Sequence, residues 1–223
     1  MSLTVPDHEL KWTNLYVRST TKEARTSAGP DLSVGGGIIR DDYTEWFVRQ
    51  LFSSQLAGEH YCRVFHTVYG METVALRYFN VFGPRQDPSS HYSGVISRFI
   101  DAFMKGTTPV IYGDGEQSRD FTFIANVVDA NIKAAASPQA AGEVMNVANG
   151  ERVTLNELAK VLGTITGKTD VRPDHQEERK GDVKHSQADN RKAVELIGYE
   201  KLVGLEEGLR RTIDWWKTSR FAN

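Results

Sequence analysis

Two arginines are candidates for binding a diphosphate in this 223-residue sequence. Arg119 lies in the run Ser118–Phe121, and Arg179 begins the run 179–189. A diphosphate is bound well by donors that keep their charge and form two parallel hydrogen bonds, as the guanidinium group does. Arginines are also common as solvated surface residues, so the residue type alone leaves both interpretations open.

Two polar residues, Asn80 and Gln86, follow an expected strand at residues 73–79. This strand is apolar or aromatic at nearly every position, which is typical of burial on both faces of a parallel sheet. Open α/β sheets bind ligands at the carboxyl ends of their strands, so Asn80 stands where a ligand is expected. The alternative is that both residues only form the turn that follows the strand.

The elements that must position these residues alternate between helix and strand from residue 42 onward. Helical spacing of apolar residues and short apolar runs predict helices at 42–68, 95–106, 126–136, 155–166, 192–197 and 205–221, and strands at 73–79, 109–112, 119–123 and 143–147. Thr154 and Glu157 have the spacing of a capping box. The alternation predicts an α/β layered fold. Residues 1–41 show no sustained period and are expected to form an irregular N-terminal segment.

Composition argues against several classes of protein. Lys and Arg total 27 and Asp and Glu total 29, and this near balance disfavours a general nucleic-acid binder. Cys62 is the only cysteine, which excludes an intrachain disulfide and a cysteine-rich zinc site. The six histidines show no metal-ligand spacing, so no metal is expected. Neither a membrane helix nor a secretory signal is visible, and we expect a cytoplasmic protein.

The glycine patterns that cradle phosphates are absent from this sequence. The pattern G-x-G-x-x-G fails after Gly35 and Gly37, where Arg40 stands, and after Gly113 and Gly115, where Ser118 stands. The Walker A pattern and the G-x-S-x-G elbow are absent as well. We therefore expect no dinucleotide phosphate cradle from this chain.

The run Leu76–Pro88, LRYFNVFGPRQDP, resembles the strand-and-loop signature of the extended short-chain dehydrogenase/reductase superfamily, which contains the NAD-dependent nucleotide-sugar epimerases and dehydratases. The runs Tyr112–Gly115, Ser118–Phe121 and Arg179–Asp189 agree with it in order and spacing, and the last is most similar to the UDP-N-acetylglucosamine 4-epimerase branch. The resemblance covers about residues 56–223. It implies that residues 42–223 hold the C-terminal strands of an NAD(P)-binding Rossmann-type sheet, interleaved with the smaller α/β domain that binds the nucleotide sugar.

The resemblance implies a role for each residue at the diphosphate and the sugar. Arg119 and Arg179 would hold the UDP phosphates, Asn80 would contact the diphosphate, and Gln86 would lie near the sugar. Ser186 would decide substrate choice, because a small side chain there leaves room for an N-acetyl group. A serine favours UDP-GlcNAc and UDP-GalNAc, with UDP-Glc and UDP-Gal as further substrates.

The resemblance also implies roles at the nucleoside and the cofactor. Tyr112 would pack on the uracil ring, with Val95 and Val110 lining that pocket, although an ordinary core aromatic is an open alternative for Tyr112. Asp182 would accept hydrogen bonds from the ribose hydroxyls. Tyr78 would be a cofactor-binding residue that contacts NAD.

The chain departs from the family at the residues that carry out its chemistry. The family uses a Tyr-x-x-x-Lys pair, in which the tyrosine is the general acid/base and the lysine lowers its pKa. The matching positions hold Leu51 and Gln55, neither of which transfers protons usefully at neutral pH. The resemblance also begins abruptly at Leu56, which suggests a truncated or fused gene or an out-of-frame N-terminal segment. We expect no turnover by this chain alone, and NAD binding by it is not expected either.

Three functions stay open at this point. The first is a UDP-sugar 4-epimerase-like protein, related to isomerases but inactive as this chain. The second is a catalytically dead nucleotide-sugar-binding module, and the third is a relative of the nucleotide-sugar dehydratases and decarboxylases. The helix at 42–68 is a candidate surface for a homodimer, although its apolar stripe is equally explained by the core.

Overall fold

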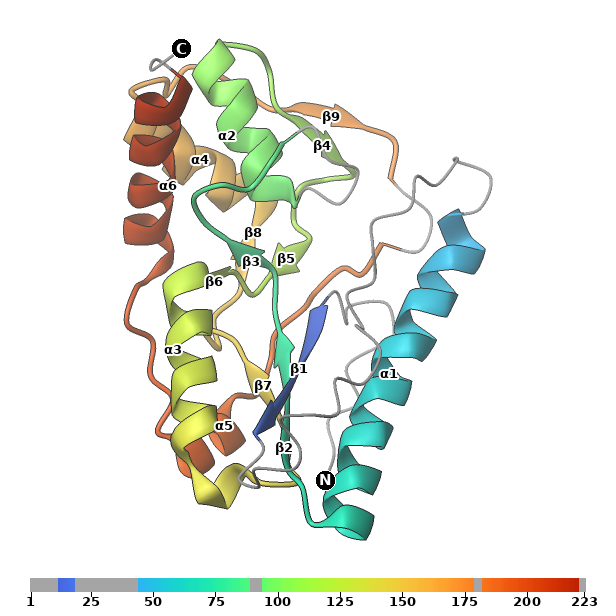
Figure 1. The fold of residues 1–223 in the computed structure, drawn as a ribbon. Helices are drawn as coiled ribbons and strands as arrows, with labels where there is room; N and C mark the ends of the chain where they lie inside the picture. Colours follow the sequence, from blue (N-terminus) through green and yellow to red (C-terminus); the bar gives the residue numbers. More distant parts are fainter. Residues whose placement is uncertain (1–11, 19–43, 89–93, 179–181, 221–223) are drawn as a thin grey trace.

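The computed structural model describes residues 12–18, 44–88, 94–178 and 182–220. Within these ranges, the side chains of residues 12–18, 44–55 and 219–220 are outside the description. The fold is α/β, as the sequence predicts (Figure 1).

A three-stranded sheet forms the centre of one end of the molecule. Its order is β1 (Trp12–Arg18), β2 (Glu72–Tyr78) and β7 (Val144–Val147). β2 runs parallel to β7, with Ala75 opposite Val144, and antiparallel to β1. The 26-residue helix α1 (Thr44–Tyr69) lies on one side of the sheet, and α3 (Ile124–Ala136) and α5 (Arg191–Ile197) lie on the other (Figure 1). The middle of β2 is buried, as its apolar sequence predicts.

The strand β1 lies before residue 42, where the sequence analysis expected an irregular segment. It pairs with β2 along its whole length, from Trp12 opposite Tyr78 to Arg18 opposite Glu72. Its sequence, WTNLYVR, alternates weakly and is flanked by polar residues, so periodicity alone did not separate it from a loop. The division of the chain at residue 41 stays a prediction.

Helices α2 (Val95–Lys105), α4 (Leu155–Thr166) and α6 (Leu205–Arg220) enclose a second core at the other end of the molecule (Figure 1). Their cluster of buried side chains contains Phe99, Phe103, Leu158, Leu162 and Ile213. A 3₁₀ turn, η4 (Pro138–Ala140), follows α3.

Short paired strands connect the two ends of the molecule. They are β3 (Val81–Phe82) with β6 (Thr122–Phe123), β4 (Val110–Tyr112) with β9 (Asp174–Gln176), and β5 (Ser118–Arg119) with β8 (Val153–Thr154). The strand expected at 119–123 is therefore two strands, β5 and β6, separated by Asp120 and Phe121. At this break, Arg119 ends β5, and the carboxylate of Asp120 accepts hydrogen bonds from the amides of Asn149, Gly150 and Ala188.

The capping box predicted at the start of α4 is confirmed. Thr154 Oγ1 accepts a hydrogen bond from the Glu157 amide at 3.1 Å, and Glu157 Oε2 accepts one from the Thr154 amide at 2.8 Å. The hydrogen bonds that Glu157 Oε2 accepts from the Thr154 amide and hydroxyl lower the pKa of Glu157. The box also satisfies amides that the first turn of a helix leaves unpaired. It joins β8 directly to α4.

Candidate functional site

A segment that we call the strap, residues 182–189, runs beside β5. The Ser118 amide donates to the Lys184 carbonyl at 2.8 Å, and the Ser186 amide donates to the Ser118 carbonyl at 3.0 Å. Ser118 Oγ lies 3.0 Å from His185 Nδ1. The two segments are more than sixty residues apart in the sequence, so only the fold brings them together.

Arg119 and Asp182 form an ion pair where the strap meets β5. Arg119 Nη2 donates to Asp182 Oδ1 at 2.6 Å, and Arg119 Nη1 donates to the Ser118 carbonyl at 2.9 Å. Arg119 is 7% exposed, whereas the Asp182 side chain is 37% exposed. The structure thus brings together two of the residues that the sequence singles out, and holds the guanidinium in one orientation.

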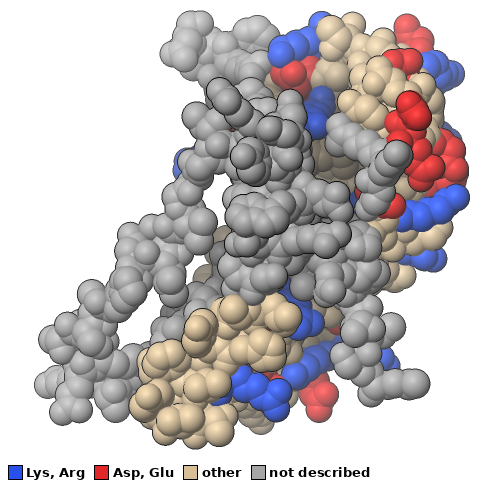
Figure 2. Space-filling view, turned by 90° about the vertical axis from the view of Figure 1, so that its right-hand side faces the viewer, with Lys and Arg blue, Asp and Glu red and all other residues tan. Residues whose placement is uncertain are grey.

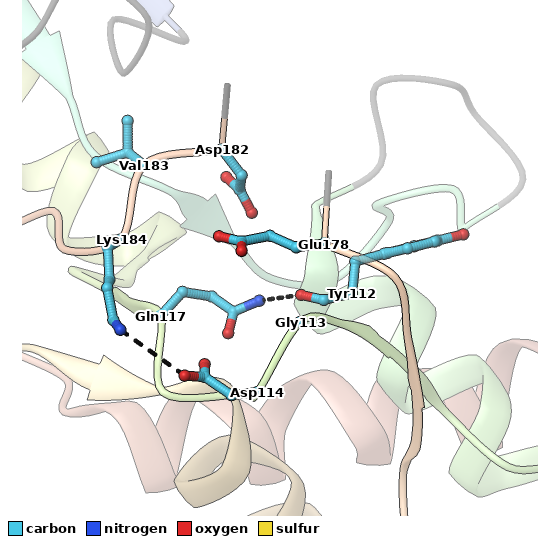
Figure 3. A pocket seen from close by; sticks show the side chains of 8 residues that line it. All are labelled: Tyr112, Gly113, Asp114, Gln117, Glu178, Asp182, Val183 and Lys184. Carbon is cyan, nitrogen blue, oxygen red and sulfur yellow. Dashed lines mark hydrogen bonds and ion pairs between the residues drawn. The ribbon is translucent and has the colours of Figure 1, made fainter. Parts of the chain in front are cut away.

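A pocket of about 120 Å³ opens beside this ion pair (Figure 3). Hydrogen-bond acceptors dominate its lining, because Asp114, Glu178 and Asp182 all contribute carboxylates. Lys184 Nζ lies 3.7 Å from Asp114 Oδ2 and supplies a cation at the rim. Such a pocket fits a ligand that brings hydroxyl donors. It is lined by Tyr112, Gly113, Asp114, Gln117, Glu178, Asp182, Val183 and Lys184.

Gln117 lies across this pocket and was missed by the sequence analysis. Its Nε2 donates to the Tyr112 carbonyl at 2.6 Å, which assigns the orientation of the amide. Its Oε1 is buried and has no hydrogen-bond partner. The only signal in the sequence was its place between the runs 112–115 and 118–121.

Tyr112, expected at the uracil ring, directs its side chain away from the pocket (Figure 3). It is half-buried at the end of β4. Val110 on the same strand is 37% exposed, and Val95 packs against the core between α2, α4 and α6. The pocket is therefore not a site for a base on the Tyr112 ring, and a uracil site at these three residues stays a prediction.

Asn80 and Tyr78 use their side chains within the protein. Asn80 has a positive φ of 35°, and its Nδ2 donates to the Asp120 carbonyl at 3.1 Å. Tyr78 is 3% exposed, and its hydroxyl donates to Asn131 Oδ1 at 2.9 Å. Gln86 is half-buried, with its Nε2 next to Gly94 at the start of α2. The predicted ligand contacts of all three stay predictions.

Of the other residues that the sequence singles out, the structure describes Ser186, but not Arg179 or the side chains at positions 51 and 55. Ser186 is 5% exposed, and its Oγ is buried without a hydrogen-bond partner. Arg179 lies outside the described residues. Positions 51 and 55 lie on α1, but the side chains of Leu51 and Gln55 are also outside the description.

Asp120, which the sequence analysis also missed, is the most deeply buried acid next to the site. Its side chain is fully buried, and burial raises its pKa from 3.8 to about 6. Backbone amides of Asn149, Ala188 and Gly150 donate to it and oppose this rise. The carboxylate therefore stays ionised at neutral pH through amide donors rather than a cationic partner.

Among the described residues, the strand-to-helix connections that are described in full offer no phosphate cradle for a dinucleotide. In these connections β6 passes directly into α3 and β8 directly into α4, with no glycine-rich turn between strand and helix. In the same residues, no group of three or more histidine, cysteine or acidic side chains could hold a metal ion. Of the helices described, none is long and apolar enough to cross a membrane.

Comparison with known proteins gives a consistent result. Residues 45–148 match the NAD dependent epimerase/dehydratase family. A UDP-glucose 4-epimerase from Mycolicibacterium smegmatis is 33% identical over 165 residues, which are 74% of this chain and 52% of that protein.

Two solved structures share the fold. A UDP-glucose 4-epimerase from Thermotoga maritima, solved with UDP-glucose, is 38% identical with a TM-score of 0.71, over 76% of this chain and 53% of that one. A UDP-N-acetylglucosamine 4-epimerase from Methanobrevibacter ruminantium, solved with UDP-N-acetylmuramic acid, is 42% identical with a TM-score of 0.70, over 75% and 53%. The chain spans about half the length of the curated relatives it matches. The sequence match and the shared fold show that this chain, over its C-terminal part, belongs to the NAD dependent epimerase/dehydratase family.

Proposed function

We propose that this chain binds a UDP-sugar through the strap and β5, and that it does not catalyse epimerisation by itself. The observation that carries the proposal is the buried Arg119 guanidinium, oriented by Asp182 beside a pocket rich in acceptors. A guanidinium in one orientation suits the oxygens of a diphosphate, and the carboxylates suit the hydroxyls of a ribose. The related structures solved with UDP-sugars support the same ligand class.

The proposed sugar is N-acetylated, as in UDP-GlcNAc or UDP-GalNAc. Ser186 is small and buried, and its hydroxyl has no partner in the protein. A larger side chain at this position of the strap would fill space next to β5. UDP-Glc and UDP-Gal are included as smaller ligands that the same space accepts.

Catalysis is excluded from the proposal because the residues for it do not fit. NAD supplies hydride transfer in this family, yet the described residues provide no cradle for its phosphates. The general acid/base positions hold Leu51 and Gln55. We therefore derive no proton or hydride step for this chain.

The partner that we propose besides the UDP-sugar is a second copy of the chain. The part of α1 whose side chains are described exposes several large apolar residues. They are Leu56, Tyr61, Val64, Phe65, Val68 and Tyr69. Figure 2 views the molecule from the side on which α1 lies, and at its lower end an uncharged surface is bordered by patches of Lys, Arg, Asp and Glu.

Calorimetric titration of the purified chain with UDP-GlcNAc, without NAD, tests the proposed function. We expect saturable binding that weakens by about tenfold or more in Arg119→Ala, because a charge-assisted contact to the diphosphate is lost. Arg210→Ala is the matched control, since Arg210 pairs with Glu206 on the exposed side of α6. No binding by the wild-type chain, or equal loss in both variants, would contradict the proposal.

A further inference from the structure

The carboxylate of Asp120 receives hydrogen bonds from two segments that are distant in sequence. Its Oδ1 accepts from the Asn149 amide at 2.9 Å, and its Oδ2 accepts from the Gly150 amide at 2.9 Å and the Ala188 amide at 3.4 Å. Asn149 and Gly150 belong to the β7–β8 connection, and Ala188 belongs to the strap. A buried amide without an acceptor is costly, so these three donors hold both segments against Asp120.

Neighbouring bonds show that the same region holds the candidate ligand residues in place. Asp120 directly follows Arg119, and its backbone carbonyl accepts the bond from Asn80. Gln187 Nε2 on the strap donates to the Gly150 carbonyl at 2.5 Å, so the strap and the β7–β8 connection also contact each other. A shift of the Asp120 carboxylate would therefore move Arg119 and the strap relative to one another.

We propose that Asp120 is the positioning residue of the UDP-sugar site, because its carboxylate holds the strap and the β7–β8 connection against β5. The identity of the ligand in this inference rests on the proposed function. The role of Asp120 in holding the strap and the β7–β8 connection does not depend on it. Asp120 touches no ligand atom in this proposal and acts through Arg119, Asp182 and Ser186. The ionised form is the one that can accept all three amide bonds.

The charged and titratable groups around Asp120 determine how the inference is tested. Burial raises the pKa of Asp120, and the charge of Glu151 on the β7–β8 connection adds to this rise. Burial also raises the pKa of the Tyr199 phenol to about 12, and the Asp120 charge adds to that rise. Arg119 lies beside Asp120 in the chain. The strap carries Asp182, Lys184, His185 and Asp189. Hydrogen bonds from Arg191 lower the pKa of Asp189 to about 2, below the pH range of the test, whereas His185 needs a control of its own.

Hydrogen exchange of the backbone amides tests the structural part without any ligand. In Asp120→Asn, the side-chain NH₂ faces amide donors, so we expect faster exchange over residues 182–190 and 148–152 than in the wild type. Thr122→Val is the matched control, because Thr122 is buried nearby and its Oγ1 has no hydrogen-bond partner. Equal exchange of these segments in the two variants would overturn the inference.

The pH profile of UDP-GlcNAc affinity tests the functional part. The diphosphate diester of this ligand does not titrate near neutral pH, so a change in affinity reports on the protein. We expect the affinity of the wild-type chain to fall by about tenfold between about pH 8 and about pH 5, and His185→Asn to keep this fall. Asp120→Asn should bind more weakly and show no such fall.

The possible results separate the role of Asp120 from the binding of the UDP-sugar. A wild-type affinity that does not change with pH would overturn the positioning role, and this measurement needs no Asp120 variant to fold. Loss of the pH dependence in His185→Asn would overturn it too. No binding by the wild type at about pH 8 would contradict the proposed function instead, and the exchange comparison would still decide whether Asp120 holds the strap.

Discussion

At the scale of single residues, the contact between Glu59 and Arg77 joins α1 to β2. Arg77 Nε donates to Glu59 Oε1 at 2.8 Å and Arg77 Nη2 donates to Glu59 Oε2 at 2.7 Å, and the Glu59 side chain is 6% exposed. We expect Glu59→Ala to lower the free energy of unfolding by about 2 kcal/mol, because two charge-assisted bonds are lost and part of a cation is left unpaired. Glu206→Ala, which breaks an exposed pair with Arg210, should cost about 0.5 kcal/mol or less. Urea denaturation measures both, and equal costs would contradict the prediction.

The buried Asp120 makes a prediction for the pH dependence of stability. Its pKa rises from 3.8 to about 6 on folding, so the folded state binds the proton more tightly than the unfolded state does. Its contribution to stability is therefore complete below about pH 4 and is lost as the pH rises through about 6, with a total of about 3 kcal/mol at most. The free energy of unfolding of the wild type minus that of Asp120→Asn should decrease across this pH window. Above the window, the difference should stay constant. Parallel curves over the whole range would show that the pKa of Asp120 does not rise on folding.

At the scale of elements, Lys168 closes the C-terminal end of α2. Its Nζ donates to the carbonyls of Phe103 and Met104, and Gly106 ends the helix in the left-handed conformation with φ 73°. A lysine at this end satisfies free carbonyls and interacts favourably with the helix dipole. We expect Lys168→Met to lower the free energy of unfolding by about 1 kcal/mol, whereas Lys160→Met on the exposed face of α4 should have little effect. Equal effects in thermal or urea denaturation would contradict the cap.

The helices could be predicted from the sequence, and much of the site could not. Repeating apolar residues and the Thr154–Glu157 box predict α2 and α4 within a residue or two, because these signals are local. Strands of two residues, such as β5 and β8, have no period to detect. Gln117 and Asp120 were missed because their importance comes from contacts with distant segments, and spacing along the chain carries no information about such contacts. Arg119 and Asp182 were found only because their runs resemble a known family.

At the scale of the whole molecule, the candidate site lies where the two cores meet. One core lies between α2, α4 and α6, and the other covers the sheet on the side of α3 and α5. The short pairs β3–β6 and β5–β8 and the strap cross from one to the other, so the site is held by hydrogen bonds more than by apolar packing. This arrangement suits a buried carboxylate as the group that positions the strap, beside the small apolar cluster that Ala188 of the strap forms with Phe79 and Ala148.

The outer face of α1 makes the prediction that belongs to the assembled protein. Val64 and Val68 are 49% and 64% exposed, and Phe65 and Tyr69 pack on one another with ring centroids 5.4 Å apart. Apolar residues gathered on one face are typical of an interface, and burying them against a second copy would remove this area from water. We expect sedimentation to show a dimer, and the double change Val64→Lys with Val68→Lys to shift it to monomer without unfolding it. Val128→Lys on α3, where Val128 is 51% exposed, should leave the dimer intact. A wild-type chain that is monomeric at every concentration would contradict the proposed dimer.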